Sequence, residues 1–178
     1  MACNSITLQS IDARCENSVG GIKRIMLANR DDVTATIASS SNPNELITSI
    51  TKASGKKFAE WKFRPNTGSY TSTATVDNTI GNSSVSTTVT LQFSKAEATK
   101  RVAIQQALQA GAVVLVEDMY GQVLYLGLDN DVYVTSATMV SGTQNSDLSG
   151  FTVEFTDTSF GLPHFVDTTK VDVNSLLV

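Results

Sequence analysis

Few residues of this chain can carry out acid–base, nucleophilic or metal chemistry. The 178 residues include two cysteines, one histidine and three prolines. His164 stands alone beside Pro163, and the sequence has no phosphate-binding loop, no G-x-S-x-G motif and no H-E-x-x-H motif. Cys3 and Cys15, with one distant histidine, do not make a zinc site. The sequence therefore predicts a non-enzymatic protein with no cofactor and no metal.

The acidic residues leave one alternative open. The adjacent pairs Asp31-Asp32 and Glu117-Asp118 are not ready catalytic dyads, because neighbouring residues on a strand face opposite ways. Carboxylates that the fold brings together from distant positions can still be catalytic, as in glycosidases. The run Asp129–Asp131 lacks the spacing and the closing glutamate of an EF-hand, so we interpret it as a turn.

Membrane and export signals are also missing from the sequence. No run of 18 apolar residues occurs, which excludes a membrane-spanning helix. The first ten residues have neither a basic region nor an apolar core, so we expect no signal peptide. Without a secretion signal, Cys3 and Cys15 are expected to be free thiols.

Serine and threonine are abundant, with 20 and 22 residues respectively. Threonine favours strands, and both residues suit strand edges and loops, so the chain is predicted to be mainly β. The clearest strand is 84–93, where Val85, Thr87, Val89, Leu91 and Phe93 alternate with a polar row of Ser84, Ser86, Thr88, Thr90 and Gln92. A period of two is typical of a half-buried strand. We predict one domain, 1–178, that is mainly β.

One helix is predicted, at about 94–110. Ser94 and Glu97 have the spacing of a capping box, and Ala103, Ile104 and Ala107 follow on one stripe. Gly111 stands where a left-handed C-cap would end the helix. Further strands are predicted at 5–11, 22–28, 33–38, 58–64, 111–116, 122–127, 132–140 and 151–155, and at 45–53, which also fits a helix.

The segment Pro65–Ser83 is polar and long, and lies between two predicted strands. A loop of this length without structure is unusual in a compact domain. We interpret 64–84 as a loop or a long hairpin, with Tyr70–Val76 as strand, that projects from the body. It is either a plain surface loop or an arm that orders on a neighbouring subunit. The arm 1–21 and the tail 165–178 are further candidate assembly elements.

Charge is divided unevenly along the chain. Residues 1–110 carry twelve bases and eight acids, whereas residues 111–178 carry nine acids and Lys170 as the only base. The division is either chance or a sign that copies meet with faces of opposite charge, head to tail. The acidic half argues against tight binding of nucleic acid, which requires clustered lysine and arginine.

Two stretches carry a resemblance to a known group of proteins. The pattern C-x-S-I-T…C…VGGIKRIMLAN in Cys3–Asn29 resembles the start of small phage virion proteins, and VEDMYGQVLYLG…VTSATMVSGTQNSDLSGFTVEFT in Val116–Thr156 resembles their second half. Within that group the chain is most similar to tail tube subunits, including those of contractile injection systems. The resemblance implies a β-sandwich or barrel with one flanking helix, in hexameric rings that stack into a hollow tube.

The resemblance also implies where the protein acts and with what. It predicts a structural protein of the virion tail, assembled in the host cytoplasm, whose partners are further copies of itself and other tail or neck proteins. DNA passes through the tube as cargo without specific binding. The expected lumen-facing row is Ser84, Ser86, Thr88, Thr90 and Gln92, and the expected subunit contacts are Tyr70, Thr73, Val76, Asp77, Ile80, Leu176 and Leu177.

Two other functions fit the same composition. One is a different virion role, such as a neck or connector protein, a tail terminator or a head-decoration protein. The other is a carbohydrate- or receptor-binding β-sandwich, which should display exposed aromatic residues for stacking. Trp61, Phe63, Tyr125 and Phe151 fall on rows predicted to face inward, so Tyr70 and Tyr120 are the loop aromatics left for that role.

Overall fold

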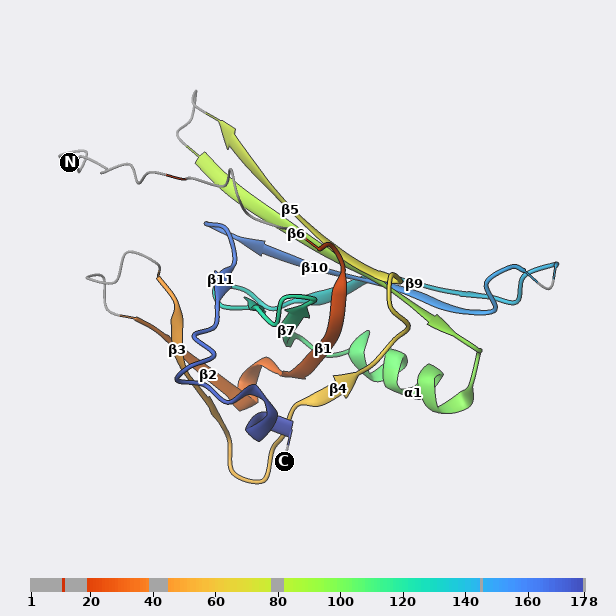
Figure 1. Ribbon diagram of the computed structural model, residues 1–178, viewed down its shortest axis with the longest axis horizontal. Helices are drawn as coiled ribbons and strands as arrows, with labels where there is room; N and C mark the ends of the chain where they lie inside the picture. Colours follow the sequence, from red (N-terminus) through yellow and green to blue (C-terminus); the bar gives the residue numbers. More distant parts are fainter. Residues whose placement is uncertain (1–10, 12–18, 39–44, 78–81, 145, 178) are drawn as a thin grey trace.

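The protein is mainly β, with one α-helix and three antiparallel sheets in its described part (Figure 1). The computed structural model describes residues 11, 19–38, 45–77, 82–144 and 146–177. The antiparallel sheets and the one helix confirm the predicted fold class. The predicted strand 5–11 and both cysteines lie outside the described residues, apart from Ile11.

The strands form three layers. The middle sheet has the order β11-β8-β7-β1-β4, and the outer sheet has the order β5-β6-β10-β9. A small two-stranded sheet, β2-β3, lies on the opposite side of the middle sheet (Figure 1). The strands are β1 (Ile22–Asn29), β2 (Val33–Ile37), β3 (Ile47–Lys52), β4 (Ala59–Trp61), β5 (Gly68–Asp77), β6 (Asn82–Ser94), β7 (Ala112–Asp118), β8 (Val123–Leu126), β9 (Tyr133–Val140), β10 (Gly150–Ser159) and β11 (His164–Phe165). The 3-10 turns η1 (Arg30–Asp32) and η2 (Val173–Leu177) complete the chain with helix α1 (Ala98–Ala107).

The middle sheet is covered on both faces, which explains the uninterrupted apolar run of β7. Val114 and Val116 pack in one cluster with Val89, Leu91 and Phe93 of the outer sheet, whereas Val113 and Leu115 pack in a second cluster on the other face. A strand that is buried on both sides needs apolar residues at every position. The second cluster includes residues from β2, β3 and the C-terminal segment, namely Val33, Ile47, Val171, Val173 and Leu176.

The segment 64–84, predicted as a loop or a projecting hairpin, forms a hairpin of β5 and β6. β5 pairs with β6 from Gly68 opposite Leu91 to Asp77 opposite Asn82, with no register shift. The alternation of β6 is confirmed, because its apolar row and Thr87 are buried while Ser84, Ser86 and Gln92 are exposed and Thr88 and Thr90 are half-buried. The stretch 45–53 contains strand β3 (Ile47–Lys52) and no helix, as the β-branched content favoured.

The predicted capping box is wrong. Ser94 is the last residue of β6 and lies opposite Gly150, and Lys95 N–H donates to Ser149 O at 2.6 Å. This strand pairing holds Ser94 away from the helix, so α1 begins at Ala98 with Glu97 as N-cap and no side-chain cap hydrogen bond. Glu97 instead forms ion pairs with Lys95 and Lys100.

The predicted glycine cap is also wrong. The helix ends at Ala107 with Leu108 as a right-handed C-cap, and Gly111 is not among the residues with positive φ. A side chain at Gly111 would collide with the carboxylate of Asp131. Gly111 therefore lets the Asp131 side chain pack against the start of β7, a contact that sequence patterns for helix ends do not reveal.

Candidate functional site

One face of the outer sheet is a continuous surface of small polar side chains. β5, β6 and β10 pair without a register shift, and β9 pairs with β10 with one shift, between Glu154 and Phe155, so the exposed row of each strand lies beside the exposed row of the next. This polar face consists of Ser69, Thr71, Thr73 and Thr75 of β5, Ser84, Ser86, Thr88, Thr90 and Gln92 of β6, Thr152, Glu154, Thr156 and Thr158 of β10, and Thr135, Ser136 and Thr138 of β9. One large aromatic residue shares the face, Tyr133 of β9, which lies opposite Thr156 and is 53% exposed. The row predicted in β6 is thus one quarter of a surface that four strands build.

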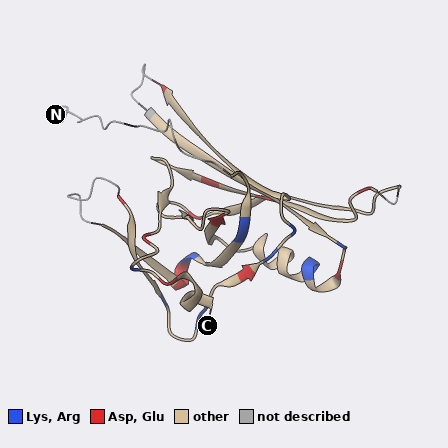
Figure 2. Ribbon diagram, viewed as in Figure 1, with Lys and Arg blue, Asp and Glu red and all other residues tan. Residues whose placement is uncertain are grey.

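The polar face has no positive charge. None of the four strands contains lysine or arginine, and Figure 2 shows the outer sheet without blue along its strands. Glu154 is the charged residue within the face, and it is half-buried. Neighbouring hydroxyls bond one another, as Thr135 Oγ1 and Thr156 Oγ1 do at 3.0 Å. Such a face can contact a polyanion without holding it, because phosphate binding depends on lysine and arginine.

Both edges of the outer sheet are open in the described part of the chain. β5 pairs with β6 alone, and β9 pairs with β10 alone. β5 has ten residues and β9 has eight, so each edge presents a long row of backbone groups. Exposed edges of this length are a template for pairing with another strand, and proteins normally cover or pair them.

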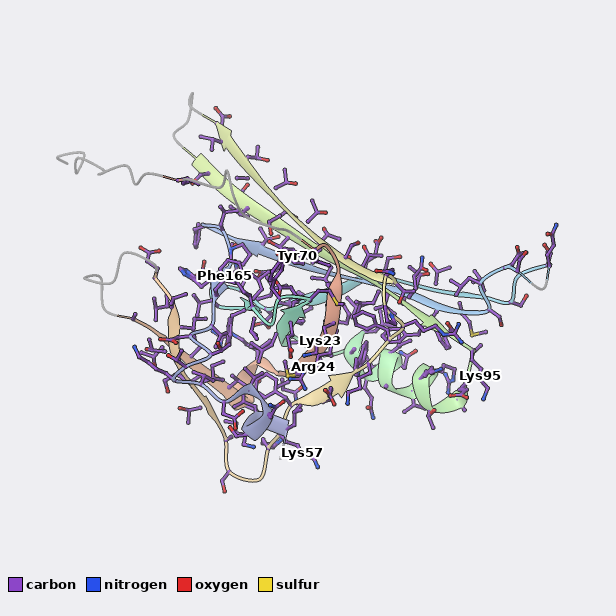
Figure 3. All side chains as sticks on the ribbon, in the orientation of Figure 1. Lys23, Arg24, Lys57, Tyr70, Lys95 and Phe165 are labelled. Carbon is purple, nitrogen blue, oxygen red and sulfur yellow. The ribbon has the colours of Figure 1, made fainter. Side chains whose placement is uncertain are left out.

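The hairpin residues predicted for subunit contacts lie at the open β5 edge. Thr73 and Val76 are exposed, Tyr70 is 37% exposed, and Asp77 is the last residue of β5. Figure 3 shows Tyr70 on the outer sheet. Ile80 lies outside the described residues.

The C-terminal residues predicted for subunit contacts are placed differently. Leu176 is buried in this chain's second cluster, and Leu177 packs against it. Phe58 N–H donates to Leu176 O at 3.0 Å, which fixes the tail on its own subunit. The assignment of Leu176 to an assembly surface is therefore wrong, because the intramolecular core takes its side chain. Leu177 is half-buried, and its assignment stays a prediction.

A group of ion pairs that the sequence did not predict links β1, β4 and β7 of the middle sheet, and Arg24 of this group also donates a hydrogen bond to the C-terminal segment. Arg24 bonds Glu117 through Nε, Glu60 through Nη1 at 2.7 Å, and Asn174 Oδ1 through Nη2 at 2.9 Å. Lys23 Nζ lies 2.6 Å from Glu117 Oε1. Burial raises the pKa of Glu117, but the hydrogen bonds from Lys23 and Arg24 outweigh it and hold the pKa below its ordinary value. These residues are 93 or 94 positions apart and no local pattern links them.

Asp157 is a buried carboxylate on the inner side of β10. It is 3% exposed, and its Oδ1 has no hydrogen-bond partner among the described residues. Burial raises the pKa of Asp157; the N–H of Gly127 opposes this rise, and the nearby Asp129 adds to it. A carboxylate that is desolvated without full compensation destabilises the folded chain when it is ionised.

We expect Asp157→Asn to raise the free energy of unfolding at neutral pH by about 1 kcal/mol. The folded state binds the proton of Asp157 more tightly than the unfolded state, so this residue's penalty fades as pH falls to the ordinary aspartate range. The advantage of the variant should therefore shrink between pH 7 and pH 4. Urea unfolding of both proteins at the two pH values measures the difference in the free energy of unfolding. A variant less stable than wild type at pH 7 would contradict a destabilising role of the ionised Asp157.

The described residues contain no group of three or more His, Cys, Asp or Glu side chains placed to hold a metal ion. His164 Nδ1 lies 2.9 Å from Glu45 O, a backbone contact. None of the described helices is long and apolar enough to span a membrane. The chain matches no protein-family model, no curated protein and no solved structure.

Proposed function

We propose that this chain is the structural subunit of a hollow tube, the tail tube of a phage virion. The observation that carries the proposal is the outer sheet, which combines two open edges with a polar face that lacks positive charge. The polar face lines the bore, and the rest of the subunit forms the wall. The function is passive: the tube conducts DNA and catalyses nothing.

The two open edges supply the contact that closes a ring. The β5 edge of one copy pairs with the β9 edge of the next, so that the outer sheets of all copies join into one barrel. Closure removes every exposed edge of the outer sheet. We infer six copies per ring, the number that the resemblance to tail tube subunits implies.

The polar face suits a bore through which DNA moves. Hydroxyl and amide groups keep the surface wetted, and the absence of lysine and arginine avoids the counterion release that drives binding to phosphates. Glu154 adds weak repulsion, which keeps the polyanion away from the wall.

The hairpins at the two ends of the outer sheet suit stacking of rings. The β5–β6 turn lies beside the start of β6, because Asp77 pairs with Asn82. The β9–β10 turn lies beside the end of β6, because Gly150 pairs with both Val140 and Ser94. The two hairpins extend in opposite directions (Figure 1). At the ends of such a tube, other tail or neck proteins bind in place of a further ring.

Electron microscopy of the purified chain at high concentration tests the proposal. We expect closed rings and stacks of rings with an open bore. A protein that stays monomeric at millimolar concentration would refute it. Retention of the protein on carbohydrate resin, or rings that cap one end of a tube without stacking, would favour the binding module or the terminator.

A further inference from the structure

An apolar groove runs beside helix α1. Two adjoining cavities of about 290 and 340 Å³ lie between α1 and β4, and Trp61 and Ala103 line both. The Trp61 ring packs edge-on against Phe93, with 5.5 Å between ring centroids, and this contact holds the Trp61 side chain in place in the groove. A cavity of about 150 Å³ already admits a benzene ring, so each cavity has room for an aromatic side chain.

Lysines surround this groove. Five of them line the two cavities: Lys52, Lys56, Lys57, Lys62 and Lys100. Three of these lysines are in ion pairs, Lys56 with Asp32 at 3.2 Å, Lys62 with Glu60 at 3.1 Å and Lys100 with Glu97 at 3.5 Å. The lining still holds five lysines against two acids, Asp32 and Glu60, so its net charge is positive. Lys57 extends away from the body of the protein (Figure 3). The groove therefore suits an apolar group that arrives with negative charge.

The loop between β10 and β11 has the matching character. Phe160 is 77% exposed and Leu162 is 63% exposed. Phe160 N–H donates to Asp129 Oδ2 at 3.4 Å, and Asn130 Nδ2 donates to Thr158 O at 2.6 Å, so the acidic turn is fixed against this loop. No lysine or arginine occurs between residues 111 and 169. Phe160 and Leu162 are thus exposed apolar side chains next to the acidic turn that contains Asp129.

The groove and the loop lie at opposite ends of the outer sheet. Ser159, just before the loop, pairs with Val85 near the start of β6. Helix α1 follows the end of β6 at Ser94. Figure 1 shows α1 and the end of β10 on opposite sides of the molecule. A loop and a groove at opposite ends of one subunit cannot meet within that subunit, but they can meet between copies arranged head to tail.

We propose that the loop of one copy inserts Phe160 and Leu162 into the groove beside α1 of a second copy in the adjacent ring. Burial of the two side chains drives the contact, and Asp129 faces the lysines of the groove. The charge division along the chain then sets the direction of stacking, because the acidic half of each copy meets the basic half of the next. This inference rests on the proposed tube.

Ala103→Trp and Phe160→Asp test the contact from its two sides. Tryptophan at 103 fills the groove, and aspartate at 160 removes the inserted ring. We expect both variants to form rings but to need at least about tenfold more protein to form tubes, a change of about 1.4 kcal/mol. Val102→Trp is the matched control, because Val102 is an exposed neighbour on the same helix that does not line the groove. Circular dichroism confirms that each variant is folded, and wild-type stacking by both groove and loop variants would overturn the inference.

A disulfide between copies tests the same contact without reference to tubes. Phe160→Cys protein is mixed with Ala103→Cys protein, each carrying Cys3→Ser and Cys15→Ser, so that a heterodimeric disulfide can form only between different copies. We expect that product in excess over either homodimer. If rings are absent but the heterodimer forms, the ring proposal fails and this contact stands. If tubes form without the heterodimer, the contact is wrong and the tube proposal stands; without tubes or heterodimer, both fail.

Discussion

Ala74→Pro is expected to leave the subunit folded and to weaken ring closure by more than about a hundredfold. Gln92 N–H donates to Thr67 O at 2.9 Å, so Thr67 and Gln92 form a hydrogen-bonded pair. Such pairs alternate along an antiparallel ladder, which makes Ala74 opposite Val85 a non-hydrogen-bonded pair. The N–H of Ala74 therefore points to the open edge, and proline there breaks no bond within the hairpin.

The size of the effect on ring closure follows from what β9 of the next copy would lose. The β9 carbonyl that faces residue 74 is left without a donor, and the proline ring prevents close approach of the two strands at that point. The lost bond and the unpaired carbonyl together cost about 3 kcal/mol per contact, which raises the protein concentration needed for rings by more than about a hundredfold. Analytical ultracentrifugation of wild type and variant over a concentration series measures this change.

Ala74→Val is the control for this experiment. Valine keeps the N–H, favours strand, and adds a side chain at an exposed position. Rings of the valine variant with loss of rings in the proline variant would place the contact in the backbone of the β5 edge. Normal rings from the proline variant would show that β5 does not pair with another copy.

Ser86→Lys is expected to make the tube retain linear DNA. Ser86 is exposed on the polar face, where its neighbours across the strands are Thr73 and Thr158, so no carboxylate neutralises the new lysine. Every ring adds a circle of positive charges around the bore. With six to ten phosphates contacted, affinity should fall about 10³- to 10⁵-fold between 50 and 200 mM salt, whereas wild-type tubes retain no DNA.

Closed circular DNA distinguishes the bore from the outside of the tube. A lysine inside the bore can retain linear duplex that has threaded through, but it cannot retain a closed circle. Ser175→Lys is the external control, since Ser175 is exposed in η2, on the other side of the middle sheet from the polar face. Ser86→Gln controls for the change of size. Equal retention of linear and circular DNA by Ser86→Lys would place this face on the exterior and contradict the proposed bore.

The strands were largely predictable from the sequence, because each pattern reflects a local constraint. The alternation in 84–93 indicates a strand with one solvent-exposed face and one buried face. The unbroken apolar run in Ala112–Val116 indicates a strand that is buried on both faces. The hairpin at Tyr70–Val76 was also predictable, since a polar segment rich in threonine between two strands favours a third.

Errors arose where a tertiary contact overrode a local signal. Ser94 fits a helix cap in the sequence, but its backbone already pairs with Gly150, so the strand continues through it. Leu176 looks like part of a free apolar tail, but the middle sheet presents a second apolar face in which its side chain is buried. The Arg24 ion pairs and the groove at Trp61 join residues from distant parts of the chain, so no window of sequence contains them.

By itself the sequence determined the mainly β class, the polar rows, the small number of catalytic side chains and the division of charge, because these depend on composition and on the period of two. Only the tertiary structure decided that four polar rows align into one face, that both edges of this sheet are open among the described residues, and that the groove and the exposed loop lie at opposite ends. Alignment, edges and ends depend on the register between strands far apart in the chain. That register is fixed by how the sheets pack, and not by any single strand.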